Sequence, residues 1–231
     1  MWNIEAKIIK TGTITIDPGC RPWNIYFEKK HQMGIGGGST VTLIKEEDDL
    51  ILVDTGFDYE SDFSENNKLN NWIRLKTLLN LNGISHLNIT KVLITHLHRD
   101  HFENIEKFKN AKWYCHKEEL SNFENPLKEK FNTIDDGEFI SLNTRVIQTP
   151  GHTKGHCSIL WTDENESIRV AISGDAIINL AYLQSGILWK HNPNFYDEDK
   201  ANNSIKFLLE NSDIIIPGHG QPFFTSILKN K

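Results

Sequence analysis

Short apolar runs bounded by charged or polar turns dominate the first half of the chain. The runs at 39–44 (STVTLI) and 50–56 (LILVDTG) flank the charged stretch KEEDD, and this pattern predicts a β-hairpin. Residues 70–83 instead carry apolar side chains at helical spacing and end in Gly83, which predicts a helix. The run at 89–95 (ITKVLIT) then predicts a buried strand.

The second half of the chain continues this mixture of strands and helices. The remaining predicted strands are 112–115, 145–150, 156–161, 168–173 and 212–218, and the last runs into a loop. The remaining predicted helices are 103–108, 117–123 and 196–211. Because helices interrupt the strands without strict alternation, we expect mixed layers of helices and sheets. No repeat, low-complexity segment or Pro/Ser-rich linker is visible, so we expect a single domain over residues 1–231.

Size and charge narrow the class of protein. A chain of 231 residues can bury a large hydrophobic core without disulfides or structural metals. Its net charge of −6 argues against a general nucleic-acid binder. Its first ten residues carry charges where a signal peptide needs an apolar core, and no run reaches the roughly 20 apolar residues of a membrane span. We therefore expect a cytoplasmic protein without membrane contact. Cys20, Cys115 and Cys157 are widely spaced, which indicates reduced thiols rather than disulfides.

Metal-capable side chains follow several of the predicted strands. Asp54 follows LILV, the cluster HLHRDH follows KVLIT, and Asp175 follows RVAISG. His152 and His219 follow the strands at 145–150 and 212–218 through Pro-Gly turns. Because the carboxyl ends of strands in layered folds gather on one rim, we expect these distant positions to converge.

The stretch THLHRDH at 95–101 is the densest of these clusters. Side chains alternate along extended chain, so His96 and His98 point the same way, while Asp100 and His101 follow where the chain turns. Two such pairs suit two adjacent metals better than one. Imidazole and carboxylate are usual ligands of zinc, iron and manganese.

Residues elsewhere in the chain complete the candidate site. His152 is a candidate third ligand for one metal, and Asp175 has two oxygens with which one carboxylate can bridge two cations. His219 stands between two glycines, which lets its loop turn tightly. Asp54 is a candidate to orient a histidine N–H from behind the ligands, and His156 is either a similar support or a surface residue. The other histidines are interpreted as surface or loop residues: His31, His86, His116 and His191.

The motifs VDTG, THLHRDH, TPGHTKGH, SGDA and PGHG, in this order, resemble those of the metallo-β-lactamase superfamily. The stretches STVTLI…ILVDTG, NITKVLITH and IIIPGHGQPF are most similar to its short, single-domain metallo-β-lactamase domain-containing (MBLAC-type) proteins. The resemblance implies an α+β fold, an αββα four-layer sandwich, with two metals at one edge between the sheets. It implies one metal held by His96, His98 and His152. It implies a second metal held by Asp100, His101 and His219, with Asp175 bridging and Asp54 in support.

Departures from the family pattern narrow the substrate. Zinc β-lactamases of the main type carry a cysteine where this chain has Asp175 and lack a histidine at His101, which argues against antibiotic hydrolysis. Glyoxalase II proteins carry a glutathione-binding helical domain after the position of His219, and this chain has only twelve residues there, which argues against a glutathione thioester as substrate. Quorum-quenching lactonases of similar size place a tyrosine where this chain has Ile178, which separates the chain from them.

These features together predict a binuclear metal-dependent hydrolase. A hydroxide bridging two divalent ions, preferably zinc with iron or manganese also acceptable, would cleave an ester, lactone, thioester or phosphodiester, with Asp100 and Asp175 as catalytic carboxylates. We expect a small-molecule, ester-type substrate. Three alternatives remain: a mononuclear iron enzyme that oxidises sulfur compounds, an RNA-cleaving nuclease of the same superfamily, and a non-catalytic binding module.

Three loops are expected to form the substrate pocket: 18–38, 57–70 and 179–196. Their aromatic side chains either line a partly apolar pocket or pack in the core or an interface. These residues are Trp23, Tyr26, Phe57, Tyr59, Tyr182, Trp189, Phe195 and Tyr196.

Overall fold

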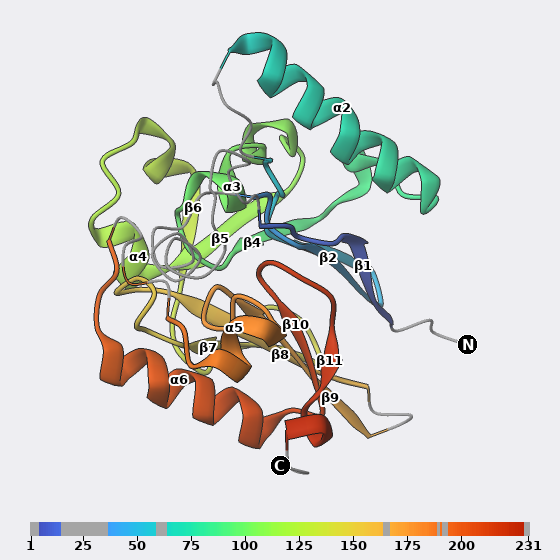
Figure 1. Ribbon diagram of the computed structural model, residues 1–231. Coiled ribbons are helices and arrows are strands. Elements are labelled where there is room, and N and C mark those ends of the chain that lie inside the picture. Colours follow the sequence, from blue (N-terminus) through green and yellow to red (C-terminus); the bar gives the residue numbers. More distant parts are fainter. Residues whose placement is uncertain are drawn as a thin grey trace, which may run out of the picture.

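Two β-sheets lie face to face, with helices on both outer faces (Figure 1). The computed structural model describes residues 5–14, 37–58, 64–163, 167–188, 190 and 194–228. Helix α2 (Glu65–Leu81) lies outside the first sheet, and helices α5 (Leu180–Ser185) and α6 (Glu198–Asn211) lie outside the second. This arrangement confirms the expected αββα sandwich.

The first sheet has six strands in chain order. They are β1 (Glu5–Lys10), β2 (Val41–Glu46), β3 (Asp49–Val53), β4 (Lys91–Ile94), β5 (Lys112–His116) and β6 (Phe131–Ile134). Strands β1 to β3 pair antiparallel, and β2 and β3 form the predicted hairpin, with Thr42 opposite Val53. Strands β3 to β6 run parallel, so their carboxyl ends meet at one edge.

The second sheet has the order β11-β10-β9-β8-β7. Its strands are β7 (Thr144–Gln148), β8 (Cys157–Asp163), β9 (Ile168–Gly174), β10 (Ile214–Pro217) and β11 (Phe223–Phe224). Strands β9 and β10 are parallel and the other pairs antiparallel. The loops after β9 and β10 therefore leave the sheet side by side, which brings SGDA next to PGHG.

Alternation along the central strands fills two cores at once. Leu43 and Leu52 face α2, where they pack with Leu75 and Leu79 of the helix. Their neighbours in the chain face the second sheet instead, because successive side chains point to opposite sides of a strand. Those neighbours are Ile44 and Ile51, which join Leu93 of β4 and pack with Ile159, Trp161 and Ile172 of the second sheet. A third cluster, which includes Leu208 and Ile215, fixes α6 to the second sheet.

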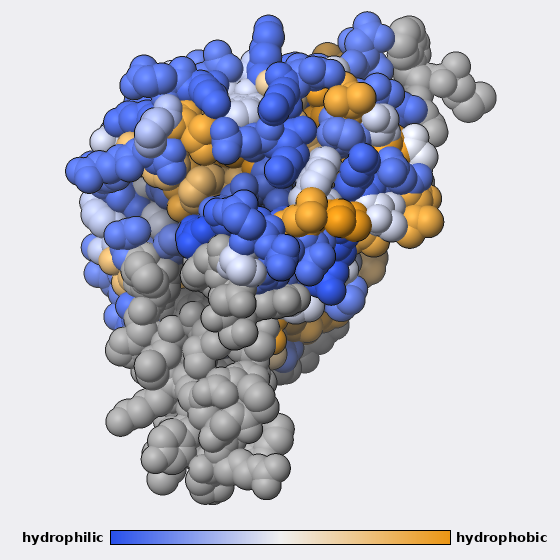
Figure 2. All heavy atoms as spheres, turned by 90° about the horizontal axis from the view of Figure 1, so that it is seen from above, coloured by the Kyte–Doolittle hydropathy of each residue, from blue (hydrophilic) through white to orange (hydrophobic). Residues whose placement is uncertain are grey.

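Helix α2 extends the predicted 70–83 helix toward the N-terminus. The Ser64 hydroxyl caps it by accepting the backbone N–H of Asn67. Its outer face is mixed, because Leu69, Ile73 and Leu81 are exposed there. Figure 2, seen from above, shows hydrophobic side chains scattered among hydrophilic ones on this side of the molecule. Only the opposite stripe of the helix contributes to the core.

Several elements differ from the sequence predictions. The helix predicted at 103–108 is replaced by α3 (Arg99–Phe102) and a 3₁₀ turn at Ile105–Lys107. Strands β1, β6 and β11 were missed, and all three lie at sheet edges. An edge strand buries fewer side chains, so its apolar alternation is weak: Asn132 and Thr133 of β6 are exposed. The predicted helix at 117–123 is present as α4 (Lys117–Ser121).

Two further expectations concern cysteines and membrane contact. Cys115 and Cys157 are buried free thiols, and burial raises the pKa of both. Cys20 lies outside the described residues. Within the described part of the chain, no helix combines the length and apolar character needed to cross a bilayer.

Candidate metal centre

The structure brings all seven predicted ligand residues together at the edge between the two sheets. Their donor atoms form two groups, within each of which the atoms lie inside 4.8 Å of one another. The first group contains His96, His98, His152 and Asp175. The second group contains Asp100, His101 and His219. Four separate chain segments thus meet, as the strand-end pattern predicts.

Three imidazole nitrogens converge in the first group. His98 Nδ1 lies 2.8 Å from His96 Nε2 and 3.0 Å from His152 Nε2. His96 follows β4 of the first sheet, and His152 lies in the loop between β7 and β8 of the second. The group is therefore assembled across the sandwich. His98 is its least buried member.

The Asp175 carboxylate lies between the two groups. Its Oδ2 is 3.2 Å from His152 Nε2 in the first group. Its Oδ1 is 3.3 Å from both His101 Nε2 and His219 Nε2 in the second group. Asp100 completes the second group, because its Oδ2 lies 3.3 Å from His219 Nε2. One carboxylate thus presents one oxygen to each group.

A glycine makes room for this carboxylate. A Cβ atom at Gly218 would lie only 2.0 Å from Asp175 Oδ1 and 2.9 Å from the Gly174 carbonyl oxygen. Any side chain at position 218 would therefore displace Asp175 or the loop after β10. The PGHG motif is explained by this close approach, which places His219 beside Asp175.

Asp54 supports the second group from behind. Its Oδ2 accepts a hydrogen bond from His101 Nδ1 at 2.7 Å, and its Oδ1 accepts the backbone N–H of Thr95 at 2.8 Å. With its Nδ1 proton held by Asp54, His101 directs Nε2 toward Asp100 and Asp175, and a metal would bind this atom after its proton is lost. Asp54 adopts a left-handed backbone conformation with φ of 60°, which aspartate tolerates better than most residues.

Two further contacts orient imidazoles, and sequence reasoning missed both. The Thr95 hydroxyl lies 2.9 Å from Asp54 Oδ2, to which it donates, and 3.2 Å from His96 Nδ1. The Thr13 carbonyl oxygen lies 3.0 Å from His219 Nδ1 and accepts a hydrogen bond from it. Thr95 stands directly before His96, so its position in the sequence could have indicated its contact with the site. Thr13 is 206 residues from His219, so the sequence gave no indication of that contact.

The burial of two further histidines tests how they were interpreted from sequence. His156 is fully buried, which excludes its surface interpretation, and burial lowers its pKa to about 3. Its Nδ1 lies 2.8 Å from the Thr149 hydroxyl, and its ring packs 5.1 Å from that of His96. His116 is also buried, contrary to its surface interpretation, and its Nδ1 caps α4 by accepting the Glu118 backbone N–H. His86 is partly exposed, whereas His31 and His191 lie outside the described residues.

The donor set fits divalent cations. His101 Nε2 and Asp175 Oδ1 are buried without a well-formed hydrogen bond to any described residue. In the first group, one proton on His98 Nδ1 cannot point straight at both His96 and His152. A cation among the three nitrogens would bind all of them. Imidazole nitrogens and carboxylate oxygens are the ligands that zinc, iron and manganese accept.

Comparison with known proteins assigns the family. The family model described as the metallo-beta-lactamase superfamily matches residues 34–219. The chain belongs to this superfamily. The match includes every residue of both groups, from His96 to His219, as well as Asp54.

Relatives in the superfamily support the assignment. A probable metallo-hydrolase from Methanocaldococcus jannaschii is 33% identical over 60% of this chain and 63% of its own length. Metallo-beta-lactamase domain-containing protein 1 from Xenopus laevis is 28% identical over 66% of this chain and 64% of its own length, in line with the predicted MBLAC-type resemblance. The chain thus spans less than two thirds of the length of either relative.

Solved structures share the superfamily fold. A probable metal-dependent hydrolase from Staphylococcus aureus superposes with a TM-score of 0.69 at 16% identity, covering 96% of this chain and 91% of that one. An N-acyl homoserine lactone hydrolase, with its product bound at the catalytic metal centre, gives 0.60 at 22% identity, covering 78% and 80%. These likenesses confirm the metallo-β-lactamase fold.

The two groups of this superfamily site differ in their protonation. Burial opposes charge on His101, but Asp100, Asp175 and Asp54 outweigh it and raise its pKa well above the usual value. Burial likewise opposes charge on His219, yet Asp175 and Asp100 raise its pKa to about 10. In the first group, burial and the neighbouring imidazoles hold the pKa of His96 well below the usual value. Without metal, His101 and His219 are therefore protonated, whereas His96 is neutral.

This difference predicts pH-dependent loading of the second group. A cation must displace the proton of His219, whose raised pKa keeps it protonated below about pH 10. Between pH 7 and pH 9, the affinity of the second group for zinc should therefore rise by up to about tenfold per pH unit for each proton that binding releases. The zinc affinity of the first group should change little over the same range. Calorimetric titration in two buffers of different ionisation enthalpy measures the released protons. Equal heats in both buffers would contradict this prediction.

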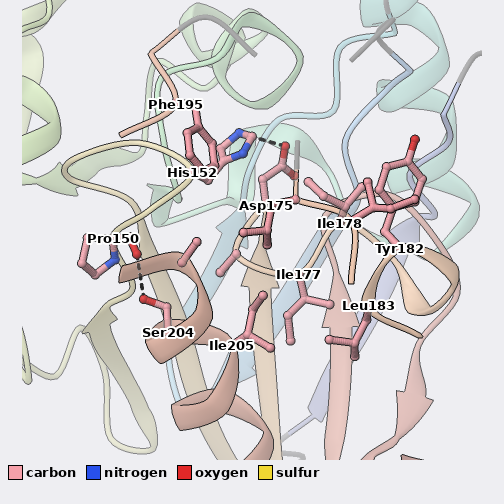
Figure 3. Close-up of a pocket in the computed structure, with 14 residues that line it drawn as sticks. Pro150, His152, Asp175, Ile177, Ile178, Tyr182, Leu183, Phe195, Ser204 and Ile205 are labelled. Atoms are coloured by element: carbon pink, nitrogen blue, oxygen red, sulfur yellow. Dashed lines mark hydrogen bonds and ion pairs between the residues drawn. The ribbon is translucent and has the colours of Figure 1, made fainter. Parts of the chain in front are cut away.

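Two pockets flank the first group. One is largely apolar and lies beside His152 and Asp175 (Figure 3). Its walls include Ile177, Ile178, Tyr182, Leu183 and Phe195. The other opens beside His98 and is mixed in character, with Phe123, Asn122, Lys154, Asn194 and Tyr196.

The loop aromatics divide between the two predicted alternatives, pocket lining and core packing. Tyr182 and Phe195 line the apolar pocket, and Phe195 and Tyr196 line the mixed one. Phe57 is instead fully buried. The remaining loop aromatics lie outside the described residues: Trp23, Tyr26, Tyr59 and Trp189.

Proposed function

We propose that this protein is a binuclear metal-dependent hydrolase that cleaves an ester, lactone, thioester or phosphodiester bond. The observation that carries the proposal is the placement of Asp175, whose two oxygens face different groups at 3.2 and 3.3 Å. A carboxylate in this position can hold two cations side by side. The second group also has its own three donors, which supports two metals over the mononuclear iron alternative.

Each residue then has a defined part. His96, His98 and His152 would hold one metal, while Asp100, His101 and His219 would hold the other, with Asp175 shared. Zinc is the preferred ion on the basis of these ligands, and iron or manganese would also fit. When bound, two such ions lower the pKa of a water molecule and polarise the substrate oxygen.

The chain itself contributes proton handling and rigidity. The Asp100 carboxylate lies at the edge of the second group and would accept a proton from the attacking water. Asp54 keeps the His101 tautomer that leaves Nε2 available as a ligand. His96, His101 and His219 are almost fully buried, so bulk water is excluded behind the reacting atoms.

The pockets indicate a small-molecule substrate. The scissile bond would lie over His98 and Asp175, between an apolar wall on one side and amide, lysine and aromatic side chains on the other. The relative described as a lactone hydrolase, whose product binds at its metal centre, supports a carbonyl substrate. We further propose that residues 1–231 form one domain, with the site between its sheets.

A substrate panel tests this function. The protein is stripped of metal, reloaded with zinc, manganese or ferrous iron, and assayed on a p-nitrophenyl ester, a γ-lactone, an acyl thioester and bis-p-nitrophenyl phosphate. We expect turnover in at least one class that disappears on chelation and returns on reloading. Absence of turnover in all four classes by fully loaded protein, together with oxygen consumption on a persulfide, would overturn the hydrolase in favour of the iron enzyme.

A further inference from the structure

Glu119 of helix α4 connects the two chain segments that carry the histidines of the first group. Its Oε1 accepts the backbone N–H of Leu97 at 2.9 Å. Its Oε2 accepts the Thr153 hydroxyl at 2.7 Å and the backbone N–H of Gly155 at 3.1 Å. One carboxylate thus takes three hydrogen bonds, and both of its oxygens are used.

The donors are immediate neighbours of the candidate ligands. Leu97 stands between His96 and His98, in the loop that follows β4 of the first sheet. Thr153 follows His152, in the loop between β7 and β8 of the second sheet. Because the two loops belong to different sheets, neither sheet alone fixes the distance between His98 and His152. Glu119 spans that junction.

Close packing fixes the same junction independently. A Cβ atom at Gly155 would lie 1.9 Å from the backbone nitrogen of Glu119 and 2.4 Å from its Cα. The loop after His152 therefore rests directly on the backbone of α4. The contact at Gly155 fixes the distance between the loop and α4, and the hydrogen bonds of the Glu119 carboxylate fix the position of the loop along the helix.

The first group needs such a restraint. His98 Nδ1 lies within 3.0 Å of two other imidazole nitrogens. Because one proton on His98 Nδ1 cannot point straight at both, part of the repulsion among the three nitrogens remains until a cation binds. Hydrogen bonds to a carboxylate are among the stronger ones in proteins, and three of them can hold the loops together against this repulsion. The imidazoles would then be positioned before metal arrives, which lowers the cost of binding.

We propose that Glu119 is a positioning residue for the first group, which it preorganises for metal by clamping the loops of His98 and His152. The inference rests on the proposed function in one respect, that the first group binds a metal ion. Glu119 was not selected from the sequence, and its hydrogen bonds in the described part of the chain go to neighbours of the candidate ligands. Glu119 would act through Leu97, Thr153 and Gly155.

Substitution of Glu119 by glutamine tests the clamp. Glutamine keeps the size of the side chain but turns one acceptor oxygen into a donor, which would face the Thr153 hydroxyl and Gly155 N–H or the Leu97 N–H. Zinc affinity is measured by chelator competition in a His219→Ala background, in which the first group is the stronger remaining site. We expect Glu119→Gln to weaken zinc binding about 10- to 100-fold, the range typical for residues that orient ligands.

Neighbouring residues provide a graded variant and a matched control. Thr153→Val removes one of the three hydrogen bonds and should weaken zinc binding less than Glu119→Gln does. Glu118→Gln removes the same charge one residue away, where Glu118 pairs at 2.9 Å with Lys154 of the same loop. Both partners of that pair are more than a third exposed, so its loss should leave zinc affinity unchanged within about twofold.

The outcomes separate this inference from the proposed function. If the parent protein binds no zinc, the proposed function fails. If the parent binds zinc and Glu119→Gln binds it equally well, the clamp is refuted while the function stands. Circular dichroism and thermal unfolding show whether Glu119→Gln is folded; if it is not, Thr153→Val decides, and wild-type affinity in that variant would overturn the proposal.

Discussion

Replacing Asp175 by asparagine is expected to reduce zinc content from about two ions per chain to about one, and to slow hydrolysis about a thousandfold. The carboxylate faces both groups, and its Oδ1 lies 3.3 Å from both His101 Nε2 and His219 Nε2. Asparagine keeps the shape but loses the charge. The rate estimate corresponds to about 4 kcal/mol, the scale on which a metal stabilises a transition state.

The second group should lose its ion first in this variant. It would keep three donors, but its histidines could no longer share a second carboxylate, whereas the first group retains three imidazoles. Elemental analysis and steady-state kinetics on the best substrate measure both effects. Asp48→Asn, which removes the same charge from the exposed turn between β2 and β3, is the control and should behave as wild type. Full zinc content and activity in Asp175→Asn would refute the bridging role.

Asp54→Asn should have the second largest effect, a loss of about 100-fold in zinc affinity at the second group. Oδ1 of Asp54 accepts the Thr95 backbone N–H, so an asparagine would keep its oxygen there and place its NH₂ group against His101 Nδ1. That contact favours the tautomer with the proton on Nε2, directed at Asp100 and Asp175. The proton would then occupy the lone pair that a metal needs.

The backbone at this position allows a clean comparison. Asp54 has a positive φ, and asparagine tolerates that conformation as well as aspartate does, so Asp54→Asn adds little strain. Zinc titration should show a weakened second step and a preserved first step, which serves as an internal control. An unchanged second step would show that the hydrogen bond from His101 does not control the tautomer.

Most of the site could be predicted from sequence because most of its residues follow strongly apolar strands, whereas His152 follows the edge strand β7 and was marked by its Pro-Gly turn. The strands before Asp54, His96, Asp175 and His219 are central in their sheets, where burial on both faces gives an unmistakable apolar run. Central strands also fix which edge their ends reach. The αββα fold followed from the resemblance, and the alternation of Leu43 and Ile44 between two cores gives its physical reason.

The supports of the site were not predictable in the same way. Glu119 and Thr13 contribute through contacts 22 and 206 residues apart in sequence, and neither residue belongs to a cluster of histidines. His116 and His156 are buried in the folded chain, which the hydrophobicity of their neighbours in the sequence does not predict. Edge strands β1, β6 and β11 were not predicted for a related reason, because one edge of each has no partner strand. These hydrogen bonds, buried histidines and edge strands all depend on contacts between segments that are distant in the sequence.

The central claim is that the chain holds two metal ions in two groups joined by Asp175. Elemental analysis of protein that has been stripped, reloaded with excess zinc and desalted tests it most directly. The account predicts about two zinc ions per chain in the wild-type protein and about one in His219→Ala, since that substitution removes a donor of the second group only. A wild-type content of one ion or fewer, with no further loss in His219→Ala, would contradict it.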